Sequence, residues 1–301
     1  MPYKFNGKEL DEETGLYYYG ARYMQPVASI WYGVDPLTEK YANISAYTYC
    51  LGNPVKFIDP TGMGIEKSSL KKWEKLRQNV EKVRDNLQSI IIRLNAKAES
   101  KDWDSEKLAK KIGNKAERLN SLNSSIKTMD ALEASTQIYS LSCTEFGENG
   151  GVTLNTKTNV IDIRYGSVAN FVHEMTHAGQ FESGDIAFLN TGSTLLQDAY
   201  DEMAAYKAQF GYDPASVYNL TSTSVANSFD AITLEWLQGL KDATGSMPYA
   251  VGGSANTGLK PVNINSTRDD LIQAYPWITE ILKRESPNYK SKNIPGIYYK
   301  K

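Results

Sequence analysis

The chain has 301 residues, and its 33 lysines and arginines nearly balance its 35 aspartates and glutamates, so the formal net charge is −2. This balance excludes a protein that coats nucleic acid along its whole length, and the 41% apolar and 23% charged content excludes general disorder. The sequence contains no run of about 20 apolar residues, as a membrane helix needs, and no apolar signal-peptide core follows Met1.

The near-zero net charge is the sum of regions of opposite sign. Residues 1–64 carry a net charge of −2, residues 65–130 carry +6, residues 131–240 carry −10 and residues 241–301 carry +4. These shifts predict at least three compositional units in the chain.

The first unit is rich in tyrosine. Residues 1–64 hold nine of the 20 tyrosines and turn pairs such as Asn53-Pro54. Aromatic clusters such as Tyr17-Tyr18-Tyr19 predict short strands between turns. About 60 residues of such β-structure form a poor hydrophobic core alone, so we expect the unit to be the end of a larger structure.

Six sequence blocks follow one another in this unit. They are Tyr3-Lys4-Phe5-Asn6-Gly7-Lys8-Glu9-Leu10, Glu13-Thr14-Gly15-Leu16-Tyr17, Gly20-Ala21-Arg22-Tyr23, Val34-Asp35-Pro36-Leu37, Asn53-Pro54-Val55 and Asp59-Pro60-Thr61-Gly62-Met63. In this order they resemble the RHS repeat-associated core. The resemblance covers essentially all of residues 3–63, about a fifth of the chain.

In that family this segment closes a large β-shell, and a variable C-terminal domain, often a toxin, follows it. The resemblance implies a secreted or delivered effector, although this chain shows no signal peptide, and a cognate immunity protein as a partner. It also implies Asp35 as a self-cleavage carboxylate, with the break after Met63. Met24-Gln25 and Ala28-Ser29 depart from the family pattern, so a shell remnant without self-processing is the alternative.

The second unit has helical periodicity. Apolar residues recur at intervals of three and four residues from Trp73 to Leu94 and again from Leu108 to Met129. This spacing predicts two antiparallel helices of about 30 and 25 residues. Basic and acidic residues are interleaved, so we interpret the net charge of +6 as a solvated face that complements the acidic region. Binding to nucleic acid or to an anionic membrane is the alternative, and we expect neither a nucleic-acid partner nor a membrane span.

Both histidines of the chain lie in the motif His173-Glu174-Met175-Thr176-His177. Apolar and polar residues alternate over residues 160–166, which predicts a strand. Ser167 stands at the N-cap position of a following helix. Because residues four apart share one face of a helix, His173 and His177 can bind one zinc ion. Glu174 can then act as a general base on the zinc-bound water, beside an edge strand at 160–166 that can hold an extended peptide.

A catalytic zinc ion usually has three protein ligands, and the chain has no third histidine. The third ligand must therefore be a carboxylate. Residues 195–210 predict a second helix, and its Glu202-Met203-Ala204-Ala205 resembles the third-ligand helix of glutamate-zincin peptidases. We choose Glu202 as the third zinc ligand, with Asp198 as the runner-up or as a partner of a ligand imidazole.

Other polar residues near the motif are less favoured as ligands. Asp201 is expected to be solvated, and Asp185 is a weaker candidate in a loop. The group that would stabilise an oxyanion is not assigned, although three tyrosines are near in sequence: Tyr200, Tyr206 and Tyr212.

Apolar spacing predicts further helices at 225–240 and at 271–282, the second one bent at Pro276. Residues 283–301 are basic and polar, and we expect them to be loosely held. The predicted fold class is α+β: a zincin-like metallopeptidase domain at 131–285, preceded by the helical hairpin at 65–130 and the RHS core remnant at 1–64, and followed by a basic tail at 286–301.

The predicted function is that of a zinc-dependent peptidase, which hydrolyses a protein or peptide substrate as the effector domain of an RHS-family toxin. The alternative is a non-enzymatic RHS fragment with an interaction domain, whose metal site is structural or vacant.

Overall fold

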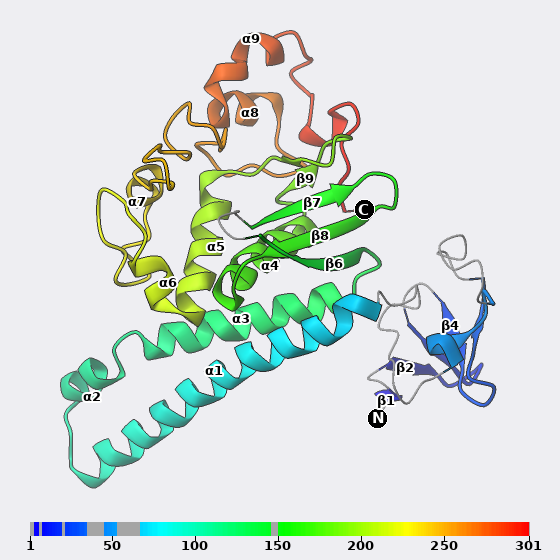
Figure 1. Cartoon of the computed structure of the whole chain (residues 1–301), viewed down its shortest axis with the longest axis horizontal. Helices are drawn as coiled ribbons and strands as arrows, with labels where there is room; N and C mark the ends of the chain where they lie inside the picture. Colours follow the sequence, from blue (N-terminus) through cyan, green and yellow to red (C-terminus); the bar gives the residue numbers. More distant parts are fainter. Residues whose placement is uncertain are drawn as a thin grey trace.

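The structure is a computed structural model that describes residues 3–5, 8–19, 22–34, 45–52, 67–145 and 150–300. The chain is α+β, with a small N-terminal sheet, a long helical hairpin and a C-terminal domain of helices around a second sheet (Figure 1). Asp35 and the bond after Met63, which the RHS resemblance implies in self-cleavage, lie outside the described residues.

The N-terminal sheet is an antiparallel meander of five short strands in chain order. The strands are β1 (Tyr3–Phe5), β2 (Lys8–Asp11), β3 (Leu16–Tyr18), β4 (Tyr23–Gln25) and β5 (Ile30–Tyr32), and the 3₁₀ turn η2 (Tyr49–Gly52) follows. Trp31 packs edge-on against Tyr19 and Tyr49, with ring centroids 5.0 and 5.1 Å away. The predicted aromatic strands are therefore present, and their rings form a core of their own.

The hairpin consists of α1 (Lys67–Ser100), α2 (Ser105–Ile112) and α3 (Lys115–Glu133). We predicted a single second helix, and this is wrong because Gly113 interrupts it. Gly113 has a φ of 52°, which a right-handed helix cannot contain, and its N–H donates to the carbonyl of Ala109 as a C-cap.

The base of the hairpin shares its hydrophobic core with the C-terminal domain. Leu76 and Val80 of α1 belong to the same buried cluster as Leu122 and Met129 of α3 and Phe171 of the domain. Burial of these side chains is the main force that fixes α3 against the domain.

The second sheet has the strand order β6 (Ile138–Cys143), β8 (Val160–Tyr165), β7 (Gly151–Asn155). We predicted β8 to be an edge strand, and this is wrong because β8 pairs in parallel with β6 and antiparallel with β7. The sheet edge nearest to the histidine motif therefore belongs to β7, which pairs with β8 across the turn between Asn155 and Val160.

One helix lies against this sheet, and a second helix packs on the first. Helix α4 (Val168–Ser183) follows β8 directly, and Ser167 caps it by accepting a hydrogen bond from the N–H of Asn170. Helix α5 (Ala199–Tyr212) packs on α4 and on α3. The hairpin, α4 and α5 form one packed group in Figure 1.

The remaining elements are short: β9 (Ala187–Phe188), β10 (Thr194–Leu195), α6 (Pro214–Tyr218), α7 (Leu234–Gln238), α8 (Arg268–Ala274), η3 (Pro276–Ile278), α9 (Thr279–Leu282) and η4 (Ser291–Asn293). The helix predicted at 225–240 is reduced to α7, because Thr233 caps its start and Ser222 folds back to donate to the carbonyl of Trp236. The single bent helix predicted at 271–282 is wrong, because the chain breaks before Pro276 into α8, the 3₁₀ turn η3 and α9.

The tail is anchored, which corrects the expectation of a loose segment. Tyr298 pairs with Phe188 of β9 through its backbone, and its hydroxyl donates to Gln137 Oε1 at 2.7 Å. Lys300 Nζ lies 3.0 Å from the half-buried carboxylate of Glu182. In the described part of the chain, no helix has both the length and the apolar character needed to cross a membrane.

Candidate metal centre

Helix α4 presents the histidine motif to the interior of the domain. His173, Glu174 and His177 are all buried, although each is ionisable. Buried groups of this kind require partners, because burial without them costs free energy. The apolar residues Phe171, Val172 and Met175 fix the helix against the sheet and hairpin, so the histidines face α5.

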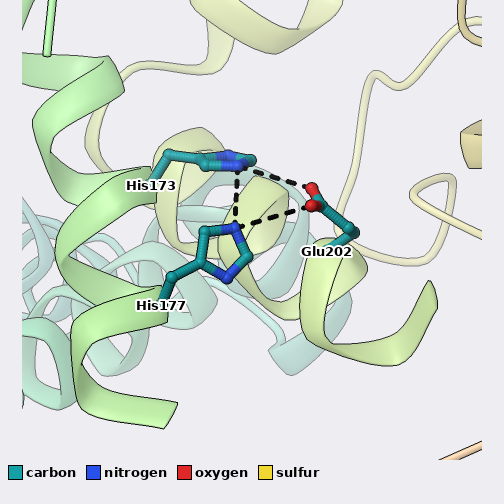
Figure 2. Close-up of side chains that lie close together, drawn as sticks. All are labelled: His173, His177 and Glu202. Carbon is teal, nitrogen blue, oxygen red and sulfur yellow. Dashed lines mark hydrogen bonds and ion pairs between the residues drawn. The ribbon is translucent and has the colours of Figure 1, made fainter. Parts of the chain in front are cut away.

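Three side chains converge between α4 and α5 (Figure 2). Glu202 Oε2 lies 3.5 Å from His173 Nε2, and Glu202 Oε1 lies 3.7 Å from His177 Nε2. The two Nε2 atoms are 3.2 Å apart. All three ligand atoms lie within 4.8 Å of one another, so the group can hold one metal ion.

Helix α5 begins in a buried capping box. Asp198 accepts hydrogen bonds from the N–H groups of Tyr200, Asp201 and Val262, and Asp201 accepts one from the N–H of Asp198. Asp198 is thus committed to the backbone and is not part of the metal group. It acts by setting the start of the helix that carries Glu202.

The expectation that Asp201 is solvated is wrong, because the capping box holds its side chain in the interior at 8% exposure. Burial, together with the nearby charge of Asp198, raises the pKa of Asp201 to about 8. Asp185, the loop candidate, accepts a hydrogen bond from Ser183 Oγ at 2.7 Å and also lies outside the metal group.

The electrostatics of the group favour a cation. Burial opposes charge on both His173 and Glu202, yet the attraction of opposite charges prevails. Glu202 and Glu174 raise the pKa of His173, and His177 together with His173 lowers the pKa of Glu202. Glu202 Oε2 is buried and has no hydrogen-bond partner. The donor atoms of His173, His177 and Glu202 therefore face one another in a buried site, an arrangement that a metal ion would stabilise.

Glutamine side chains orient two members of the group, and the sequence reasoning missed them. Gln180 Nε2 donates to the carbonyl of Asp201, which turns Gln180 Oε1 toward His177 Nδ1 at 2.7 Å. Nδ1 must then carry the proton, which leaves the lone pair on Nε2, the atom that faces Glu202. Gln197 Nε2 donates to Glu202 Oε1. The spacing of Gln180, three residues after His177 on a helix, was the available signal.

Glu174 lies one position along the helix from the first histidine. Asn170 Nδ2 donates to Glu174 Oε1 at 3.0 Å, and Asn170 Oδ1 in turn accepts from the N–H of Gly166. A β-carbon at Gly150, just before β7, would collide with both Glu174 Oε1 and Asn170 Oδ1. Glycine at this position therefore allows β7 to begin directly beside the carboxylate.

The edge of β7 is partly open. The N–H of Leu154 donates outward to the carbonyl of Gly192. By the two-residue period of a strand, the N–H of Val152 faces the same side. It has no backbone partner among the residues that the structure describes. This N–H lies two residues from Gly150, in a residue that is 5% exposed.

The three tyrosines near the motif differ in their surroundings. Tyr206 lies edge-on to His173, with ring centroids 4.5 Å apart. Tyr200 is 43% exposed, and Tyr212 packs against the hairpin core. A fourth, Tyr249, was missed because it lies in a distant loop; its ring centroid is 6.3 Å from that of Tyr206, and burial and the charge of Glu202 raise its pKa.

Comparison with known proteins finds similarity over a fifth of the chain. Over 60 residues the chain is 43% identical to the toxin subunit YenC2 of Yersinia entomophaga, and over 63 residues it is 40% identical to the tRNA(Glu)-specific nuclease WapA of Bacillus subtilis subsp. natto. Over 62 residues it is 45% identical to salivary gland surface protein 1 of Aedes aegypti. No protein-family model and no solved structure matches.

The matched segments are a small part of this chain and a smaller part of each relative. They cover 20–21% of this chain and only 6%, 3% and 2% of YenC2, WapA and the Aedes protein, respectively. The chain thus has partial homology to RHS-repeat toxin proteins. The length of the matched segment is that of the tyrosine-rich unit, 3–63, whose motif blocks carry the resemblance.

Proposed function

We propose that the chain is a zinc-dependent peptidase, in which His173, His177 and Glu202 hold the metal and Glu174 is the general base. One observation carries this proposal: two imidazoles and a carboxylate converge in a buried group, with a further buried carboxylate on the next residue of the same helix.

The donor set fits zinc. Two histidines and one glutamate form one of the recurring ligand sets of catalytic zinc, which keeps a further position open. Ligand atoms bound tetrahedrally at ~2.0–2.1 Å lie about 3.4 Å apart. The two Nε2 atoms are 3.2 Å apart, and each lies near a different oxygen of Glu202, His173 Nε2 at 3.5 Å from Oε2 and His177 Nε2 at 3.7 Å from Oε1. The partnerless Glu202 Oε2 is the oxygen nearest His173 Nε2.

When bound, zinc would supply Lewis acidity and lower the pKa of a coordinated water to about 7. The chain supplies the rest. Glu174, oriented by Asn170, takes the proton from the attacking water and returns it to the leaving amine. The open edge at Val152 pairs with the main chain of an extended peptide and places it beside Glu174.

The partial homology to RHS-associated toxins supports a biological role. We infer that the C-terminal part is the effector domain of an RHS-family polymorphic toxin, which is delivered to a target cell and neutralised in the producing cell by a cognate immunity protein. The nuclease activity in the name of WapA is not transferred, because the shared segment is 3% of that protein.

A non-enzymatic fragment with a structural metal site is the second candidate. The tight burial of the group favours it, since structural sites are enclosed. The buried Glu174 beside an open strand edge argues against it, because a structural site has no need of a general base.

The decisive test compares wild type with Glu174→Gln for zinc content and for hydrolysis of unfolded casein. We expect about one zinc ion per chain in both proteins and a loss of 10²–10⁴-fold in hydrolysis in the variant. Glu235→Gln, at an exposed glutamate of α7, is the matched control and should retain full activity. Equal hydrolysis by wild type and Glu174→Gln would remove the peptidase assignment, and zinc without hydrolysis in wild type would support the structural site.

A further inference from the structure

The helical hairpin has two halves of different chemistry. At its base, Leu76 and Val80 lie in the domain core. Arg77 forms ion pairs with Asp130 at 2.6 Å and with Glu133 at 2.9 Å. Leu76, Val80 and Arg77 of the base are thus engaged within the chain, whereas Lys71, Lys72 and Lys75 are exposed there.

The hairpin tip, residues 88–115, buries very little. Ala98 is its only buried residue, α2 contains none, and Ile92 is 59% exposed. The tip projects beyond the helices that surround the metal centre (Figure 1). Ordering this segment has a cost in conformational entropy that burial within the chain does not offset. Its exposed surface is therefore available to a partner.

The tip is basic, and its cations are available. It carries seven basic and four acidic residues, a net charge of 7 − 4 = +3. The cations are Arg93, Lys97, Lys101, Lys107, Lys110, Lys111 and Lys115. Across the part of the chain that the structure describes, none of them forms an ion pair. The four carboxylates lie between Glu99 and Glu106, interleaved with Lys101, and the other six cations lie on the two helices and at Lys115, where α3 begins.

An aromatic ring lies among these cations. Lys97 Nζ and Lys107 Nζ are 5.9 and 5.1 Å from the centroid of the half-buried Trp103 ring. Tryptophan flanked by lysines is typical of a membrane interface, where the ring lies at headgroup level and the ammonium groups extend to phosphates. Lysine is depleted in protein–protein interfaces, which disfavours a protein partner.

We propose that the hairpin tip binds a membrane surface that carries anionic lipids. The hairpin tip lies on the membrane surface and does not span the membrane. Each cation near such a surface contributes about five-fold in affinity. The inference is independent of the peptidase proposal, because no residue of the metal centre takes part.

The test is flotation of the full chain with phosphatidylcholine vesicles, with and without about 30% phosphatidylserine. Wild type should bind only the anionic vesicles and should dissociate in about 1 M NaCl. Lys107→Glu combined with Lys110→Glu and Lys111→Glu should weaken binding more than about 100-fold. The matched control reverses Lys71, Lys72 and Lys75, three exposed lysines of the hairpin base, and should bind like wild type.

Two further measurements complete the test. Binding should shift the tryptophan emission of wild type to the blue, and Trp103→Phe should lack this shift. Circular dichroism melting verifies that each variant is folded. Absence of vesicle binding by wild type would overturn the proposal, as would equal losses in the tip and base variants. Binding of an oligonucleotide that the tip variant loses, without vesicle binding, would assign the tip to nucleic acid instead.

Discussion

The N-terminal sheet and the C-terminal domain differ in what makes each of them informative. The tyrosine-rich unit has the motif blocks of a known family and a core of aromatic rings packed edge to face. Among its described residues, no side chain belongs to a metal-competent group. The C-terminal domain matches no family model or solved structure, yet it holds the buried His–His–Glu group.

The comparison shows that detectable sequence similarity and the candidate metal site can lie in different parts of one chain. In the described part of the chain, the hydrophobic clusters of the two regions share no residue. Function must therefore be argued from the geometry of the second region, and its context from the homology of the first.

Replacement of Trp31 should affect the first region alone. Trp31 is 1% exposed and packs on Tyr19 and Tyr49, so Trp31→Ala should cost about 3–5 kcal/mol of the stability of that sheet. Limited proteolysis should cut the N-terminal unit faster, while zinc content and casein hydrolysis stay within two-fold of wild type. A parallel loss of hydrolysis would show that the two regions are coupled.

Replacement of Gln180 should affect the second region alone. Without the acceptor for His177 Nδ1, the imidazole loses its fixed tautomer, and Gln180→Ala should weaken zinc affinity about 10–100-fold. Competition with a chromogenic chelator measures this. Ser183→Ala, on the next turn of α4, is the control because, among the described residues, Ser183 bonds only its own helix and Asp185. An unchanged affinity would mean that Gln180 does not orient the ligand.

The buried capping box should give the second region a pH dependence. Because folding raises the pKa of Asp201 to about 8, its ionised form destabilises the fold. The free energy of unfolding should fall as pH rises from about 4 to about 8, by at most ~1.4 kcal/mol per pH unit. Urea unfolding of chelator-treated protein should show a shallower slope in Asp201→Asn than in wild type, whereas Asp269→Asn, at an exposed carboxylate, should leave it unchanged. Parallel curves for all three proteins would contradict the burial argument.

Local patterns in the sequence were sufficient for the elements that carry the candidate site. The capping Ser167, the apolar spacing of α4 and the helix around Glu202 are encoded within a few residues of one another. A carboxylate as the third ligand was expected from chemistry, because the chain offers no third histidine, and Glu202 was chosen because its helix resembles the third-ligand helix of glutamate-zincin peptidases.

Long-range pairing was not predictable from those patterns. The position of β8 in its sheet depends on the parallel strand β6, whose paired residues lie 22 positions earlier in the chain. The tail is fixed by contacts of Tyr298 and Lys300 with residues more than 100 positions earlier. Asp201 was expected to be solvated, but its side chain lies in the capping box at the start of α5. Each of these depends on tertiary contacts, which local periodicity does not contain.

The most direct test of the central claim is metal analysis of the purified chain at neutral pH, for wild type, His173→Ala and Glu202→Ala. The arrangement of the three donors predicts one zinc ion per chain in wild type, none retained by His173→Ala after dialysis, and at least a 100-fold weaker affinity in Glu202→Ala. Absence of zinc from wild type, or full affinity in Glu202→Ala, would contradict the assignment of this group as the metal centre.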